Sequence, residues 1–151
     1  MLRDEINTAL KNAMKARDDR KVSTLRLINA AIKNADIEAQ MQGKPALAED
    51  GLLGLMQKMI KQRQESVEIY EQAGRGELAD KERGEIEIIR GYLPQQMSEE
   101  EARVAIAEAI RATGATGVKD MGKVMAALKQ GLAGKLDLGK ASGLVKGMLA
   151  R

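Results

Sequence analysis

The chain has 151 residues and a formal net charge of +3, and this length suits one domain or two small ones. It has no cysteine and no histidine, so thiol nucleophiles, imidazole bases and the usual zinc-binding sets are excluded. Its only aromatic residues are Tyr70 and Tyr92, which argues against RNA-binding folds that stack bases on aromatic side chains.

The first two thirds of the chain show the three- and four-residue apolar spacing that is typical of amphipathic helices. Asp18 or Asp19 can cap the second helix, and Gly74 can end the third in a left-handed conformation. Pro94 requires that the fourth helix ends by Leu93. The apolar positions of the four expected helices span residues 2–14, 22–32, 52–70 and 78–92.

Three shorter helices are expected in the rest of the chain. Ser98 and Glu101 have the spacing of a capping box at the start of the first one, and Gly114 ends it. Neither an alternating strand pattern nor an internal repeat is apparent. The other two helices are expected around residues 121–128 and, with Asp137 as the cap, up to 149.

The sequence therefore predicts an all-α fold. An N-terminal four-helix bundle-like domain is expected over 1–93, a linker over 94–97, and a small three-helix tail domain over 98–151. The helical pattern starts at Met1, which leaves no room for a targeting leader, and no apolar run approaches about 18 residues. Together with the absence of cysteine, this leads us to expect a cytoplasmic protein without membrane contact.

Four charged residues lie in or beside the apolar stripes of the expected helices: Arg26, Arg63, Glu82 and Glu85. An unpaired charge inside a core costs several kcal/mol, so charges at such positions need partners. We interpret the four as a structural ion cluster that sets helix register. The alternatives are a catalytic carboxylate pair with a shifted pKa, or a solvated edge.

Basic residues are concentrated at the C-terminal end of the chain. From Val118 onward, seven cations stand against two anions, Asp120 and Asp137, for a net charge of +5. A helical segment with this balance favours contact with a polyanion. The cations are Lys119, Lys123, Lys129, Lys135, Lys140, Lys146 and Arg151.

Small residues accompany these lysines. Gly139, Gly143 and Gly147 recur every four residues, on the helix face opposite the apolar side chains, and Gly122 and Ala126 are placed similarly. Each interior glycine costs a helix about 1 kcal/mol relative to alanine, so three on one face need a reason. A bare backbone edged by lysine suits close contact with the phosphates of a folded RNA. Helix packing, a protein partner, or no role at all are the alternatives.

At these residues the chain resembles the GatB/YqeY family, and the resemblance covers essentially its whole length. The N-terminal, central and tail motifs occur in the expected order. They are Arg20–Ile28 with Ala30–Asn34; Gln62-Arg63, Ser66, Ala73-Gly74-Arg75, Leu78-Ala79, Glu82, Glu85 and Tyr92-Leu93-Pro94; and Asp120–Met125, Gly134-Lys135 and Val145-Lys146.

The resemblance implies an all-helical protein homologous to the C-terminal region of the B subunit of glutamine-dependent Asp/Glu-tRNA amidotransferase. The related tail of that enzyme is taken to help hold tRNA. The family label extends to carbon–nitrogen ligase activity with glutamine as the amide donor, but activation and glutaminase chemistry reside in other domains and subunits. The chain departs from some relatives at Leu136, where the family leads us to expect a smaller or more polar residue before Asp137.

The expected function is that of a tRNA-binding accessory module that is not catalytic alone, with no catalytic residue, metal or cofactor. Its partners would be tRNA or another structured RNA, with an aminoacyl-tRNA synthetase or an amidotransferase as candidate proteins. One alternative is a protein–protein adaptor that docks a larger enzyme through the four-helix domain. Another is an amidotransferase subunit that works only with partner subunits.

Overall fold

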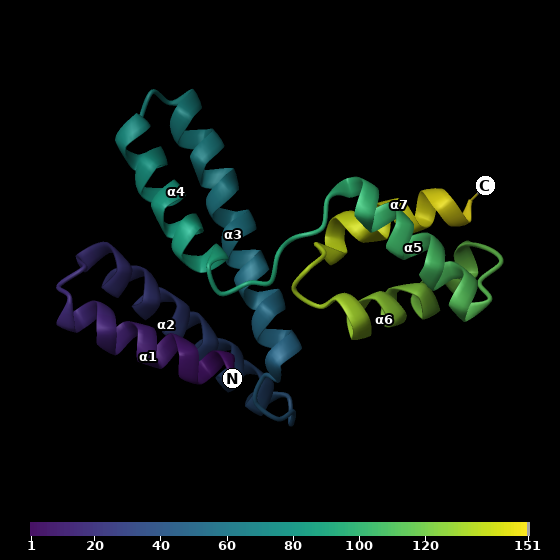
Figure 1. Ribbon diagram of the computed structural model, residues 1–151, viewed down its shortest axis with the longest axis horizontal. Helices are drawn as coiled ribbons and strands as arrows, with labels where there is room; N and C mark the ends of the chain where they lie inside the picture. Colours follow the sequence, from purple (N-terminus) through teal and green to yellow (C-terminus); the bar gives the residue numbers. More distant parts are fainter. Residues whose placement is uncertain (151) are drawn as a thin grey trace. The chain divides into compact units, whose positions relative to one another are not determined.

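The structure, a computed structural model, describes residues 1–150, which fold into seven α-helices and one 3-10 turn without a strand (Figure 1). This confirms the all-α prediction. Arg151, one of the seven cations counted above, lies outside the described residues. Within residues 1–150 no helix combines the length and apolarity needed to cross a membrane. The helices are α1 (Leu2–Lys15), α2 (Asp19–Met41), α3 (Glu49–Gln72), α4 (Gly76–Arg90), α5 (Glu99–Thr113), η1 (Val118–Asp120), α6 (Met121–Leu132) and α7 (Leu138–Leu149).

The chain divides into two compact units, Met1–Leu93 and Pro94–Arg151. The segment expected as a linker, 94–97, belongs to the second unit and is attached to it. The Met97 N–H donates to the Lys135 carbonyl at 2.9 Å, and the Gln96 side chain donates to the Gly134 carbonyl. That the two units are separate domains, joined by a linker, stays a prediction.

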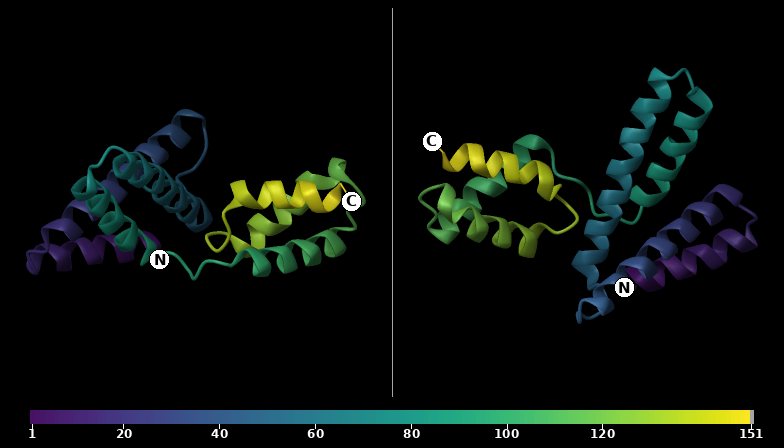
Figure 2. Two further views of the ribbon diagram at one scale, coloured as in Figure 1. Left: turned by 90° about the horizontal axis from the view of Figure 1, so that it is seen from above. Right: turned by 180° about the vertical axis from the view of Figure 1, so that it is seen from behind.

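The first unit consists of two helical hairpins, α1 with α2 and α3 with α4, which are inclined to each other (Figure 1). Helix α2 also contacts α3 and α4, so both hairpins share one core. Figure 2 shows the same pairing of helices from two other directions. The core is made of aliphatic side chains and methionines, among them Ile6, Leu25, Ile28, Leu52, Met56, Ile60, Ile86 and Ile89.

Local signals in the first unit act largely as their chemistry predicts. The Asp18 carboxylate accepts from the Lys21 N–H at 3.2 Å and caps α2, and Gly74 follows α3 with φ of +72°. Helix α1 differs from the expected stripe, because Ala13 is buried while the Met14 side chain is 51% exposed.

In the second unit, α5, α6 and α7 enclose a separate core. Ser98 and Glu101 form the complete capping box at the start of α5, and Gly114 ends the helix with φ of +67°. The residue that departs from the family pattern, Leu136, is only 5% exposed and packs into this core. An apolar residue is therefore suited to that position. The core contains Ala102, Ile106, Val124, Leu128, Leu136, Ala141, Val145 and Leu149.

Candidate nucleic-acid interface

All six lysines proposed for RNA contact lie on the surface of the second unit. Lys123 and Lys129 are on α6, Lys140 and Lys146 are on α7, and the loop between these helices carries Lys135. The sixth, Lys119, lies on the 3-10 turn η1 and not on the following helix.

Helices α6 and α7 carry the same pattern 17 residues apart, a repeat that the sequence reasoning missed. The stretches Asp120–Lys129 and Asp137–Lys146 share an aspartate, a glycine and two lysines at equivalent positions. The apolar positions between them are filled by different side chains, which hides the repeat in the sequence. The repeat can be recognised in the sequence because both stretches begin with the same four-residue pattern: Asp, an apolar residue, Gly and Lys.

The pattern places the lysines and small residues away from the core on both helices. Val124 and Leu128 of α6 and Ala141 and Val145 of α7 are buried. Because both helices turn these residues toward one core, each presents its opposite face to solvent. The result is two strips, defined as the α6 strip (Gly122, Lys123, Ala126, Lys129) and the α7 strip (Gly139, Lys140, Gly143, Lys146, Gly147), all exposed.

The glycines in these strips are not used for packing inside the unit. A Cβ atom added at Gly122, Gly143 or Gly147 would meet nothing within 4 Å apart from its own chain neighbours and helix backbone. Gly139 is also exposed. Helix–helix packing inside this unit is therefore no explanation for Gly122, Gly143 and Gly147.

Two aspartates at equivalent positions hold the starts of the two helices in different ways. The Asp137 carboxylate accepts from the Gly139 and Lys140 N–H groups at 2.9 and 3.4 Å and caps α7. The Asp120 carboxylate instead accepts from the N–H and hydroxyl of Thr116, at 3.0 and 3.3 Å. It thereby closes the turn that carries Lys119.

The Asp120 carboxylate is held in its charged form. The hydrogen bond from the Thr116 N–H is the largest cause of its lowered pKa, and the charges of Lys123 and Lys119 lower that pKa further. The Lys123 ammonium lies 4.0 Å from this carboxylate and remains highly exposed. Such a pair contributes little to stability, so Lys123 stays available for an outside anion.

The predicted ion cluster in the first unit is smaller than expected. The Arg63 Nε donates to Glu85 Oε2 at 2.8 Å and lies 4.0 Å from Glu82 Oε2, linking α3 to α4. Glu85 is 6% exposed, so its charge is compensated inside the protein. Arg26 is exposed and makes no recorded ion pair with the described residues, because its position on α2 turns it to solvent.

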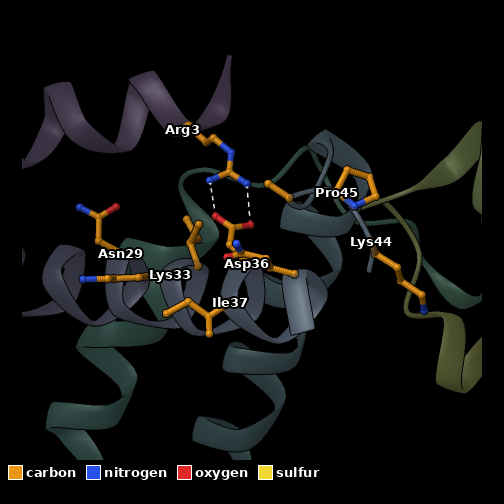
Figure 3. A pocket seen from close by; sticks show the side chains of 10 residues that line it. Arg3, Asn29, Lys33, Asp36, Ile37, Lys44 and Pro45 are labelled. Atoms are coloured by element: carbon orange, nitrogen blue, oxygen red, sulfur yellow. Dashed lines mark hydrogen bonds and ion pairs between the residues drawn. The ribbon is translucent and has the colours of Figure 1, made fainter. Parts of the chain in front are cut away.

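A cleft of about 540 Å³ in the first unit lies outside the predicted site (Figure 3). Arg3 and Asp36 cross it with a two-bond ion pair at 2.8 and 2.9 Å, and Arg3 also donates to the Leu47 carbonyl at 2.9 Å. The Arg3 hydrogen bond, followed by that from the Leu47 N–H, lowers the pKa of Asp36 to about 2. This clasp joins α1, α2 and the loop after α2. No local sequence pattern predicts it, because Asp36 lies 33 residues from Arg3 and 11 residues from Leu47.

Comparison with known proteins finds one matching family model and several curated relatives. The family model described as "Yqey-like protein" matches residues 3–149. Curated relatives named "Altered inheritance of mitochondria protein 41, mitochondrial" are 42% identical over 95 residues in Lachancea thermotolerans and 39% identical over 84 residues in Vanderwaltozyma polyspora. The matches cover 63% and 56% of this chain but 49% and 44% of the relatives, so the chain spans about half the length of the curated relatives it matches.

The comparison also overturns one expectation drawn from the sequence. The cytoplasmic location, which we expected from the helical pattern at the start of the sequence and from the absence of cysteine, is contradicted, because these relatives carry "mitochondrial" in their names. Cysteine usage does not distinguish one reducing compartment from another, and the start of a chain says little about where its relatives reside.

Proposed function

Because the chain belongs to the YqeY-like protein family, we propose that it is an accessory module that binds tRNA through its second unit and catalyses no reaction alone. The observation that carries the proposal is the pair of lysine-edged strips on α6 and α7. They combine exposed positive charge with backbone that a phosphate chain can approach closely.

The chemistry of the strips favours recognition of shape and charge. Lysine contacts phosphates as a flexible point charge and carries little base information. The chain has no tryptophan or phenylalanine, and its two tyrosines lie in the first unit, so the second unit has no aromatic platform for unpaired bases. A folded RNA with closely spaced phosphates is the ligand that suits such a surface.

Any part in carbon–nitrogen ligase chemistry with glutamine as the amide donor would require partner subunits. The described residues contain no cluster of three or more acidic side chains arranged to hold a metal. The buried carboxylate of Glu85 forms an ion pair with Arg63 at 2.8 Å. An aminoacyl-tRNA synthetase or an amidotransferase is the proposed partner, to which the module would add affinity for tRNA.

The test is binding of the full chain to total tRNA across a salt series, measured by electrophoretic mobility or fluorescence anisotropy. The variant K123Q/K140Q/K146Q should weaken binding and make the slope of log affinity against log salt shallower by about two to three, since each phosphate contact contributes about 0.9. The control K11Q/K15Q/K61Q removes the same charge from exposed lysines of the first unit and should leave the slope nearly unchanged.

Two outcomes would contradict the proposal. Binding that does not respond to salt would exclude phosphate contacts as its basis. Equal losses in the two triple variants would mean that only total charge matters and that the strips have no special part.

The adaptor function remains the second candidate. An apolar patch on α1 or α3 would favour it, but each of these helices has only one large apolar residue among the exposed ones of the described chain, Met14 on α1 and Ile69 on α3. Isolated apolar residues on a surface are ordinary. The adaptor function would be favoured if a large enzyme co-purified with this chain in the absence of RNA, through the unaltered surface of the first unit.

A further inference from the structure

Helix α2 has a second face on which large apolar side chains are exposed. Its core side carries Leu25, Ile28 and Ile32, all buried. On the opposite side Leu27 is 44%, Ile37 46% and Met41 83% exposed. Figure 3 shows the difference at adjacent residues, because Asp36 points to Arg3 while Ile37, at the edge of the same cleft, points away from Arg3.

These exposed residues follow the spacing of a coiled-coil seam. The α2 seam, defined as Leu27, Ala30, Asn34, Ile37 and Met41, advances by three, four, three and four residues, and every member is exposed. In a heptad, Leu27, Asn34 and Met41 take the a positions, while Ala30 and Ile37 take the d positions. Alternation of three and four keeps such a stripe on one side of a helix over successive turns.

Asparagine in the middle of the seam indicates which partner suits it. A single asparagine at an a position pairs best with the same residue of a parallel second helix and lowers stability against an apolar partner. Asn34 has this position between Leu27 and Met41. A second copy of the chain supplies the matching asparagine at the matching height.

The charges beside the seam point to the same arrangement. Lys33 takes the g position and Glu38 the following e position, five residues later, and both are exposed without a recorded ion pair among the described residues. In a parallel pair each g residue faces this e residue of the other helix, so two Lys33–Glu38 pairs would form by symmetry. An antiparallel pair would bring the edges with Arg26 and Lys33 together and set like charges against each other.

We propose that the outer face of α2 is a dimerisation surface for a second copy of this chain, packed in parallel through the α2 seam. This inference does not depend on the proposed RNA contact, which belongs to the other unit. The seam covers two heptads and contains one alanine and one asparagine, so association is weak, reversible and dependent on concentration.

Sedimentation equilibrium of the full chain tests this between about 5 and 500 µM, a range that brackets a weak association. The expected mass rises from the 16.4 kDa of one chain toward twice that value. Lys33→Glu alone and Glu38→Lys alone should each weaken association about tenfold, because both symmetric pairs become repulsive. The double variant K33E/E38K should restore association to within about threefold of the original.

Two further variants complete the design. Ile37→Ser should abolish association while circular dichroism confirms an unchanged helix content, because its side chain contributes little to the core. Lys58→Glu, an exposed lysine on α3, is the charge-matched control and should associate like the original.

A single 16.4 kDa species at every concentration would overturn the proposal. Association that ignores Ile37→Ser would place the contact elsewhere, and failure of the double charge exchange to restore binding would exclude the parallel register. These measurements use no RNA, so their outcome is distinguishable from that of the tRNA experiment.

Discussion

Arg63 on α3 donates from Nε to Glu85 Oε2 on α4 at 2.8 Å, and the two residues are 22 positions apart in the sequence. Both side chains are largely shielded from solvent, at 15% and 8% exposure. Arg63 also donates to the Met59 carbonyl at 3.2 Å. The pair therefore closes the α3–α4 hairpin at the edge of the core.

Loss of the Glu85 carboxylate should destabilise the protein. Glu85→Gln leaves the Arg63 guanidinium shielded with only the more distant Glu82 as a charged partner, so we expect the free energy of unfolding to fall by about 2 kcal/mol. Glu82→Gln, which alters the 4.0 Å contact, should cost less than about 1 kcal/mol. Urea unfolding measures both, and equal losses would contradict the assignment of Glu85 as the main partner.

Acid should weaken the Arg3–Asp36 clasp over a definite range. The pKa of Asp36 is lowered to about 2 in the folded protein, below its ordinary value near 3.8. The clasp's contribution is therefore fully present above about pH 4 and is lost as the pH falls toward 2. The melting temperature of the wild type should exceed that of Asp36→Asn at pH 5 and approach it near pH 2. A difference independent of pH would contradict this.

Removal of one buried hydroxyl should stabilise the first unit. Thr24 is fully buried on α2, and its Oγ1 has no hydrogen-bond partner among the described residues. Thr24→Val replaces that hydroxyl with a methyl group of similar shape, so we expect a gain of about 1 kcal/mol in unfolding free energy. A loss of stability would show that the hydroxyl is satisfied in solution.

The α7 glycines provide a test that separates stability from binding. Gly143→Ala and Gly147→Ala meet open space, so each should stabilise the helix by about 0.5–1 kcal/mol. If bare backbone serves RNA contact, the same changes should weaken tRNA binding. Gly54→Ala on α3 is the control, because it also meets open space but lies in the first unit. Unchanged RNA affinity in the α7 variants would leave the lysines alone as the basis of binding.

Much of the fold could be predicted because its signals are local. Apolar spacing located all seven α-helices, and the capping box at Ser98 and the left-handed glycines at positions 74 and 114 marked their ends. The exposure of the four lysines on α6 and α7 likewise follows from helical periodicity, whereas Lys119 and Lys135 lie outside these helices. Their contact with RNA stays a prediction.

The features that escaped prediction depend on contacts between distant residues. The Arg3–Asp36–Leu47 clasp joins three segments, and no local pattern identifies its members. Arg26 was placed in the ion cluster because it flanks an apolar stripe, but a flanking position turns to solvent or to a neighbour depending on how helices pack. Likewise, the role of Leu136 depends on the loop that folds it into the core.

The attachment of Gln96 and Met97 to the loop at Gly134 and Lys135 has a consequence for proteolysis. A protease needs several residues of chain free to enter its active site, and hydrogen-bonded backbone resists such entry. Nicking between the two units should therefore occur before Gln96 and release a C-terminal fragment that keeps both residues. Mass spectrometry of the fragment's first residue would measure how far this anchorage protects the junction.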